Sequence, residues 1–409
     1  MVKVLKVLGW TIGILVGLVA LVLLIAVLVY PYEYVRRVIA WRESDVGDYI
    51  HNFPAHLLSA SQAPFYFEKA RDDDEQRVAE LFKTLAGVND FEAFLERENT
   101  QAFIVILDDA ILYEKYFNET QRDSMLTSFS VAKSFASALI GIAIEEGYIN
   151  SVEDPITDYL PELAGRDPRF NDITIHHLLM MASGLDYQNM RWAILNGDDP
   201  ITTYYPDQRQ AALEFTKVLD SPGEYFLYNK YHPQLLGLIL KQTTGRSVAE
   251  YMQEKIWDPI GMEFDGSMSI DSEENGFEKM EAGVNARAID FAKFGRLYLD
   301  NGEWDGVQVI PPEWIAESTS VDRSIQRADY YPDEFGKLIF DKLNGYYKYM
   351  WYGFFRGEED YDFTAAGDHG QYIYVSPAKN LIIVRNSLAY GEFGDEQWLR
   401  LFFEFASDM

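Results

Sequence analysis

A serine and a lysine three positions apart, Ser130 and Lys133, form the most reactive pairing in the sequence. They open a long apolar stretch that ends at Gly147, and on a helix residues i and i+3 lie on one face, so the hydroxyl and the amine can make a hydrogen bond. Lys133 is the only charged residue between Asp123 and Glu145. Burial in such a stretch lowers the pKa of a lysine and leaves a neutral amine that can take the serine proton. The pattern predicts a serine nucleophile with a lysine base, and the alternative is a solubilising lysine beside an unrelated serine.

Other common catalytic signatures are absent from the sequence. It contains no G-x-S-x-G nucleophile elbow, no H-E-x-x-H zinc motif and no glycine-rich phosphate-binding loop. It contains no cysteine, which excludes thiol nucleophiles, cysteine-ligated zinc and disulfides. The six histidines do not recur with carboxylates at a metal-ligand spacing. We therefore expect neither a metal nor a cofactor.

The chain is long and strongly acidic. Its 409 residues are enough for one large domain or two, each with a full hydrophobic core. The 65 Asp and Glu residues outnumber the 35 Lys and Arg residues, which leaves a formal net charge of -30. A surface this acidic repels phosphate backbones, so we exclude nucleic-acid binding as the main role.

The N-terminal region has the pattern of a membrane span. No charged residue occurs from Val7 to Tyr30, and a helix of that length covers roughly 36 Å, more than the roughly 30 Å of bilayer hydrocarbon. The flanks carry basic and aromatic residues typical of membrane interfaces, namely Lys3, Lys6 and Trp10 on one side and Tyr32, Arg36, Arg37 and Arg42 on the other. No small-x-small cleavage site follows, which favours an uncleaved signal anchor over a signal peptide. A buried core helix is the alternative.

The span divides the chain into four parts. We expect a cytoplasmic tip at residues 1–6, a transmembrane anchor at 7–30, an irregular juxtamembrane connector at 31–75 and the folded domain at 76–409. The two lysines before the anchor, and the size of the domain after it, favour placing that domain outside the cytoplasm, on the periplasmic or extracellular side. The basic residues after the anchor weigh against this orientation.

Strand patterns stand at both ends of the folded domain, with helical patterns between them. Hairpin signals occur at 101–117 around an Asp108-Asp109 turn and at 371–385 around a Ser376–Asn380 turn, and helix signals occur at 130–146, 233–244 and 398–405. This order predicts one α/β domain in which the N-terminal and C-terminal strands share a sheet.

Several segments resemble the serine β-lactamase-like family, which includes class C β-lactamases, DD-peptidases, esterases and 6-aminohexanoate-dimer hydrolases. The first is SFSVAKSFASALIGIAIEEGYINSVEDPITDYLPEL around Ser130, followed by ITIHHLLMMASGL, PGEYFLYNKYHPQLLGLIL, IWDPIGM, ARAIDFAKFGRLYLDNGEWDG and AAGDHGQYIYVSP in the order of the family. The resemblance covers roughly Thr100 to Met409. It implies an antiparallel sheet of N- and C-terminal strands flanked by helices, with an additional all-helical subdomain.

The resemblance also implies roles for individual residues. Ser130 would be the acylated nucleophile, Lys133 its base and Tyr228 the group that passes a proton to the leaving group. The backbone N–H groups of Ser130 and Gln371 would form the oxyanion hole. The implied partners are a small ester or amide substrate and the membrane, without nucleic acid.

Two motifs depart from the family pattern. The Tyr-x-Asn motif reads Tyr228-Asn229-Lys230, so Lys230 replaces or displaces the asparagine that contacts substrate. The Lys-Thr-Gly motif is replaced by Asp368-His369-Gly370, and Asp368 at the usual lysine position would repel the carboxylate of a β-lactam or a D-Ala-D-Ala peptide. We therefore treat Lys230, Asp368, His369 and Gly370 as candidate substrate-binding residues, with packing as an equal alternative for His369.

These observations lead to three hypotheses. The first is a membrane-anchored serine hydrolase that acts on an ester or amide and most resembles the 6-aminohexanoate-dimer hydrolase and esterase branch. The second is a non-catalytic sensor or binding protein with the same fold, which the altered motifs would permit. The third is a cell-wall DD-peptidase or β-lactamase.

Overall fold

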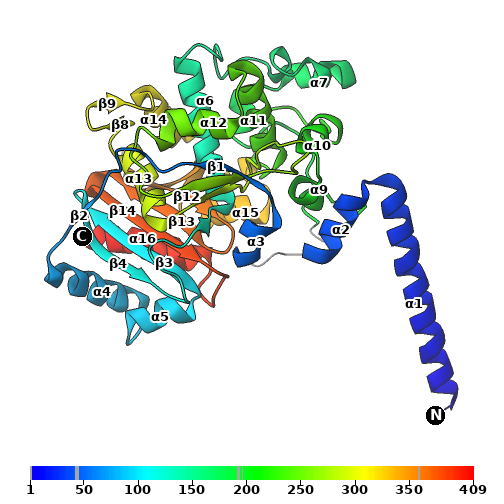
Figure 1. Cartoon of the computed structure of the whole chain (residues 1–409), viewed down its shortest axis with the longest axis horizontal. Helices are drawn as coiled ribbons and strands as arrows, with labels where there is room; N and C mark the ends of the chain where they lie inside the picture. The colour runs from blue at the N-terminus through cyan, green and yellow to red at the C-terminus, as the bar shows by residue number, and fades with distance from the viewer. Residues whose placement is uncertain (1, 42–45, 191–193, 196, 358–359) are drawn as a thin grey trace.

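The computed structural model describes residues 2–41, 46–190, 194–195, 197–357 and 360–409. A large sheet, antiparallel except for its edge strand β2, has helices on both faces and forms one part of the body, and a group of helices forms the other (Figure 1). The N-terminal helix α1 (Val2–Val29) extends away from this body. The predicted α/β fold with a helical subdomain is confirmed.

The large sheet joins strands from both ends of the folded domain. In the described part of the chain it has eight strands in the order β10-β11-β12-β13-β14-β3-β4-β2. β14 pairs with β3 in antiparallel register, from Leu381 opposite Leu107 to Asn386 opposite Ala102, as the shared sheet requires. The strands are β2 (Glu68–Lys69), β3 (Thr100–Leu107), β4 (Ala110–Tyr116), β10 (Gly345–Lys348), β11 (Trp351–Phe355), β12 (Tyr361–Gly367), β13 (Gln371–Ser376) and β14 (Leu381–Ser387).

The alternation of side chains along β13 explains why both faces of the sheet are covered. Tyr372 and Tyr374 point to one face and pack against Phe402 of the C-terminal helix α16 (Asp395–Asp408). Ile373 points to the other face, close to Gly295 of α13 (Ala288–Leu299). Because every residue of β13 is buried, this strand belongs to the centre of the domain.

Helices before the first hairpin and between the two hairpins build the remainder of the body. The helix predicted to follow Ser130 is present as a short 3-10 turn, η1 (Phe129–Val131), continued by α6 (Ala132–Glu145). The other helices are α4 (Asp72–Ala86), α5 (Phe91–Arg97), α7 (Pro161–Arg166), α8 (Ile175–Leu179), α9 (Asp198–Tyr204), α10 (Gln208–Glu214), α11 (Tyr231–Thr244), α12 (Val248–Met252), α14 (Pro312–Thr319) and α15 (Glu334–Lys337).

The segment after α1 differs from the irregular connector expected for residues 31–75. It forms α2 (Tyr32–Trp41), α3 (Val46–Asn52) and β1 (Ala55–Leu58), and β1 pairs with β6 (Gly266–Ser269) in a smaller sheet of order β1-β6-β7-β5 that also contains β7 (Val284–Ala286) and β5 (Leu126–Thr127). The remaining described strands, β8 (Glu303–Trp304) and β9 (Val307–Gln308), form a separate hairpin. Helices α2 and α3 and strand β1 therefore pack against the body, and they do not form an extended connector.

Buried side chains hold this segment in place. Arg37 of α2 is buried, and its guanidinium donates to the carbonyls of Tyr204 and Asp271 at 3.4 Å and 2.6 Å. The Tyr34 hydroxyl donates to the carbonyl of Ile194 at 3.1 Å. Helix α2 does carry an apolar stripe at helical spacing, formed by Tyr34, Val35, Val38 and Trp41, and this face packs into a small hydrophobic core. Arg42, one of the expected interfacial residues, lies outside the described residues.

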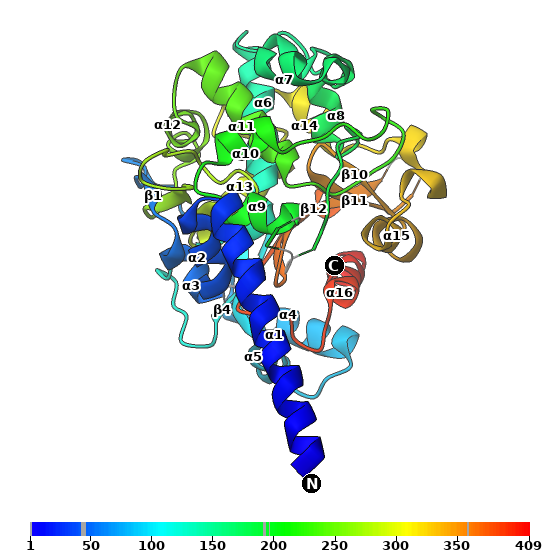
Figure 2. The ribbon, with the colours of Figure 1, turned by 90° about the vertical axis from the view of Figure 1, so that its right-hand side faces the viewer.

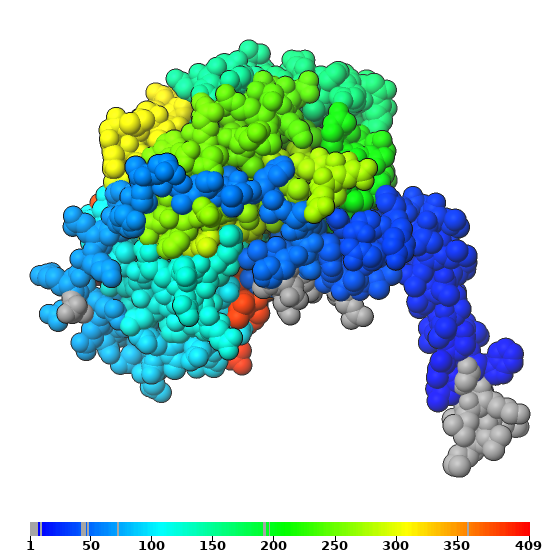
Figure 3. Space-filling view, viewed as in Figure 1, coloured from blue at the N-terminus to red at the C-terminus, as the bar shows by residue number. Residues whose placement is uncertain are grey.

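Helix α1 contrasts with the body in its exposure. Its apolar stretch from Trp10 to Val29 has a mean hydropathy of 3.3, and only 6% of its most apolar window is buried. Figure 3 shows α1, in dark blue, protruding from the body. In Figure 2, which is turned by 90°, α1 also extends away from the body. Its length and composition suit a membrane anchor or a signal sequence.

Candidate active site

The proposed nucleophile lies in a strained turn at the start of α6. Phe129, the residue before Ser130, has a φ of 42°, which is in the left-handed region that bulky side chains rarely adopt. Such a conformation costs on the order of 1–3 kcal/mol and persists only where the surrounding structure enforces it. The turn sets Ser130 at the wall of a cavity while Phe129 and Val131 are buried on either side.

Lys133 makes the contact expected from its spacing. Its Nζ donates to Ser130 Oγ at 2.8 Å and to the carbonyl oxygen of Glu281 at 2.7 Å. Its side chain is buried, and burial together with the nearby positive charge of Lys230 lowers the pKa of Lys133 to about 7. A substantial fraction of this amine is therefore neutral at physiological pH and able to accept a proton from Ser130.

Tyr228 lies beside this pair, just before α11. The Lys133 Nζ is 5.0 Å from the centroid of the Tyr228 ring. Burial raises the pKa of Tyr228 to about 12, although contacts with the Ser130 hydroxyl, Lys230 and Tyr352 favour the phenolate and oppose this rise. The Tyr228 phenol is thus protonated at neutral pH. It lies beside Ser130 and Lys133, where it could exchange a proton with either side chain.

Lys230 follows in the same cavity wall and has a carboxylate partner. Its Nζ lies 2.7 Å from Asp199 Oδ1 and donates to Thr203 Oγ1 at 3.2 Å. Burial alone would lower the pKa of Lys230, but the charge of Asp199 and its hydrogen bond raise it above the usual value. Asn229 is not available to substrate, because it is fully buried and its Oδ1 accepts from the Tyr231 backbone N–H at 2.9 Å.

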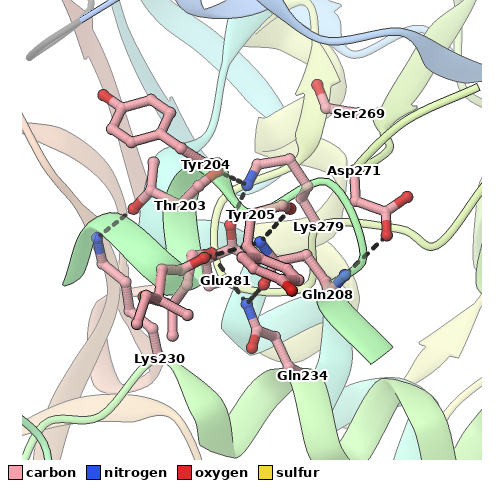
Figure 4. A network of polar contacts seen from close by, with 12 residues as sticks. Thr203, Tyr204, Tyr205, Gln208, Lys230, Gln234, Ser269, Asp271, Lys279 and Glu281 are labelled. Carbon is pink, nitrogen blue, oxygen red and sulfur yellow. Dashed lines mark hydrogen bonds and ion pairs between the residues drawn. The ribbon is translucent and has the colours of Figure 1, made fainter. Parts of the chain in front are cut away.

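A second buried lysine, Lys279, lies in a polar network next to the loop that binds Lys133. Lys279 Nζ lies 2.6 Å from Glu281 Oε1 and donates to the Thr203 carbonyl at 2.8 Å. Figure 4 shows Thr203 between Lys230 and Lys279, in a polar network that continues through Gln208 to Asp271. Because the backbone carbonyl of Glu281 accepts from Lys133, this network fixes the loop that positions the Lys133 amine.

The turn between β12 and β13 forms the opposite wall. Gly367 lies next to Ser130, since a Cβ built on it would be 2.3 Å from the Ser128 carbonyl oxygen and 3.1 Å from the Ser130 nitrogen. Asp368 follows and lines the cavity, where its Oδ1 accepts from the Tyr390 hydroxyl at 2.8 Å. Ser130 and the end of β12 are therefore adjacent.

The remaining residues of this motif have other contacts. His369 has a φ of 63° and its ring stacks on Tyr390, with ring centroids 5.4 Å apart. The Gly370 carbonyl accepts from Arg385 at 2.9 Å. Gln371 pairs with Gly367 across the hairpin, its side chain donates to the Ser387 carbonyl at 2.7 Å, and it is not among the residues that line the described cavity.

The cavity between these walls has a volume of about 320 Å³. Apolar side chains cover much of it, and its charged groups are one lysine and several carboxylates. The lining residues are Ser130, Tyr187, Asn189, Asp199, Leu227, Tyr228, Lys230, Asp333, Phe335, Leu338, Ile339, Leu343, Tyr352, Ala366, Gly367, Asp368, Tyr372, Tyr390, Asp395 and Leu399.

Several of these residues were not identified in the sequence. Asp199, Phe335, Tyr352 and Tyr390 lie outside the recognised motifs, and nothing in their local pattern distinguishes them from ordinary loop or strand residues. Within the described ranges no group of three or more His, Asp or Glu side chains could hold a metal ion.

Comparison with known proteins identifies the family. Residues 89–400 match the family model described as Beta-lactamase. The chain belongs to this family. It is 27% identical to the 6-aminohexanoate-dimer hydrolase of Paenarthrobacter ureafaciens over 327 residues, which cover 76% of this chain and 78% of that protein.

Solved structures share the fold. One is a protein from Bacillus anthracis provisionally assigned as a 6-aminohexanoate-dimer hydrolase, with a TM-score of 0.71 and 24% identity over 88% of this chain and 93% of that one. Another is a class C β-lactamase, with a TM-score of 0.59 and 14% identity over 84% of this chain and 99% of that one. The β-lactamase-like family and fold inferred from the motifs are thereby confirmed.

Proposed function

We propose that this member of the Beta-lactamase family is a serine hydrolase that cleaves an ester or amide through an acyl-enzyme on Ser130. The observation that carries the proposal is the 2.8 Å contact between Ser130 Oγ and the Nζ of Lys133, whose pKa is lowered to about 7. A serine hydroxyl becomes an effective nucleophile only when a neighbouring base takes its proton, and Lys133 is such a base.

The reaction proceeds in two steps. Ser130 Oγ attacks the substrate carbonyl carbon while its proton moves to Lys133 Nζ, and the carbonyl oxygen becomes negatively charged. Collapse of this intermediate breaks the bond to the leaving group, which takes the proton from Lys133 through the Tyr228 hydroxyl. Water then attacks the acyl-enzyme, its proton passes back to Lys133 and then to Ser130 Oγ, and the acid product leaves.

The negative oxygen needs donors at the junction of the two walls. The Ser130 backbone N–H supplies one. The family resemblance implies Gln371 as the other, but Gly367 lies next to the Ser130 nitrogen, and Gly367 and Asp368 line the cavity whereas Gln371 is not among its lining residues. We therefore place the second donor in the Gly367–Asp368 segment. Donors fixed in this way are worth about 100- to 1,000-fold in rate.

The cavity favours substrates without a carboxylate near the reacting bond. Asp199, Asp333, Asp368 and Asp395 line it, and the positive charge of Lys230 is already paired with Asp199. A penicillin or D-Ala-D-Ala peptide would bring a carboxylate towards Asp368, whereas a neutral or amine-bearing ester or amide with an apolar acyl part fits the lining. The similarity to a 6-aminohexanoate-dimer hydrolase supports an amide-cleaving branch.

We further propose that α1 anchors the enzyme in a membrane, with the hydrolase domain outside the cytoplasm. The uncharged exposed helix supports the anchor, and the two N-terminal lysines support an orientation with the N-terminus inside.

Labelling with a fluorophosphonate probe tests the activity. The intact protein should be labelled at Ser130, and Ser130→Ala should not be labelled. A screen of p-nitrophenyl esters, short amide oligomers and a chromogenic β-lactam then defines the substrate class. A folded protein without labelling would instead support the sensor or binding protein, and stable acylation by penicillin would support the DD-peptidase.

A further inference from the structure

Four aromatic rings form a continuous row beside the nucleophile. Tyr49 of α3 lies on Phe129 with ring centroids 4.9 Å apart, Phe129 lies on His369 at 5.2 Å, and His369 stacks on Tyr390 at 5.4 Å. The row begins in the segment that follows α1, passes the residue before Ser130 and ends at the rim of the cavity.

Phe129 depends on the juxtamembrane segment for its packing. It belongs to a small hydrophobic core that is separate from the main core and contains Tyr34, Tyr49 and Phe53. Tyr49 is only 4% exposed and also packs on Phe53, at 5.2 Å. The rings on both sides of Phe129 therefore supply the confinement that its unfavourable φ of 42° requires.

The opposite end of the row touches the other wall of the site. His369 is the neighbour of Asp368, in the segment where we place the second oxyanion donor, and it too has a positive φ, of 63°. The contact between the Phe129 and His369 rings thus links two backbone segments, the one that carries the Ser130 N–H and the one that carries the second donor. The substrate carbonyl would lie between these segments. A change in the spacing of these rings would change the spacing of the two donors.

We propose that Tyr49 is a positioning residue, which sets the oxyanion hole by pressing Phe129 against His369. The inference rests on the proposed function. The segment between α1 and the body then contributes to the geometry of the active site. It does so through the contact of the Tyr49 ring with Phe129.

The Tyr49 hydroxyl offers a matched control. It is buried and has no hydrogen-bond partner among the described residues, so Tyr49→Phe keeps the ring contact and removes only an unsatisfied polar atom. Tyr49→Leu keeps an apolar side chain of moderate size but removes the aromatic contact with Phe129. A third variant, His369→Asn, removes the ring from the other side while retaining a residue that tolerates positive φ.

The experiment uses the full-length protein in detergent with p-nitrophenyl butyrate and a fluorophosphonate probe. We measure kcat, KM, the rate of Ser130 labelling and the melting temperature, with activity normalised to the active sites titrated. Tyr49→Leu should lower kcat and the labelling rate about tenfold or more and leave KM within about twofold, because displaced donors weaken transition-state binding selectively. Tyr49→Phe should match wild type.

The outcomes separate the inference from the function on which it rests. If wild type is labelled and Tyr49→Leu is labelled equally fast, the positioning role is wrong and the hydrolase stands. If folded wild type is not labelled at Ser130, the proposed function fails and the inference fails with it. If Tyr49→Leu does not fold, His369→Asn becomes the test. An unchanged kcat in His369→Asn would contradict the positioning role of the aromatic row, and a lower kcat with an unchanged KM would support that role.

Discussion

Lys133 and Lys230 lie close together, yet their pKa values move in opposite directions. Lys230 has Asp199 at 2.7 Å, and this carboxylate more than offsets the effect of burial. Lys133 binds a hydroxyl and a backbone carbonyl instead, so burial and the charge of Lys230 lower its pKa to about 7. The same residue type is therefore charged at neutral pH at position 230 and partly neutral at position 133.

Together with the proposed mechanism, this relationship predicts how hydrolysis depends on pH. Because Lys133 must be neutral to act as the base, kcat/KM should rise with pH through about 7 and level off above it. Lys230→Gln removes a positive charge near Lys133 and leaves Asp199 without this cation, and both changes raise the pKa of Lys133. The rising limb should move about one pH unit upwards, within the usual size of a charge effect. An unmoved limb would show that another group governs it.

Ser130→Ala and Lys133→Ala should each abolish hydrolysis while the far-ultraviolet circular dichroism spectrum remains native. The two residues act as one unit, so the double variant should be no slower than either single variant. Near-normal turnover in Lys133→Ala would be incompatible with the Ser-Lys mechanism.

Gly367→Ala tests the junction of the two walls. The added methyl would approach the Ser128 carbonyl oxygen to 2.3 Å and the Ser130 nitrogen to 3.1 Å, so the turn or the strand must shift. We expect kcat to fall by about 100-fold, as for other small displacements of reacting groups. Gly165→Ala in α7 is the control, because its added methyl has nothing within 4 Å. Equal kcat values for the two variants would place the oxyanion hole elsewhere.

Asp368 should select against anionic substrates. A carboxylate a few ångströms from a substrate carboxylate costs on the order of 1–4 kcal/mol in a partly desolvated site, which is about ten- to a thousand-fold in rate. Asp368→Asn retains an acceptor for the Tyr390 hydroxyl and removes the charge, and Asp368→Lys reverses it. The ratio of kcat/KM for an anionic ester to that for its neutral analogue should rise in the order Asp, Asn, Lys. The same order should hold for acylation by β-lactams, and a constant ratio would mean that Asp368 does not face the substrate.

The orientation of the anchor can be tested with protease added to intact spheroplasts. The hydrolase domain should be digested while a cytoplasmic marker is protected. Full protection of the domain, with digestion only after lysis, would place it in the cytoplasm.

Features that depend only on residues close in the sequence could be predicted from the sequence. The Ser130–Lys133 contact follows from one turn of helix, and the hairpins follow from turn residues between alternating strands, because these features depend on neighbours a few positions away. The apolar stretch of α1 is equally local. The family motifs added Tyr228, whose place beside Lys133 no spacing rule could supply.

Only the tertiary structure decided the contacts between remote segments. Lys133 is held by the carbonyl of Glu281, Lys230 is paired with Asp199, and Phe129 is covered by Tyr49, in each case through packing that no local pattern records. The fold also placed Gly367 next to Ser130 and in the cavity wall, since only the three-dimensional position of the β12–β13 turn shows which of its residues come near Ser130. A lysine in an apolar helix predicts burial, but its pKa depends on the charges that distant segments bring to it.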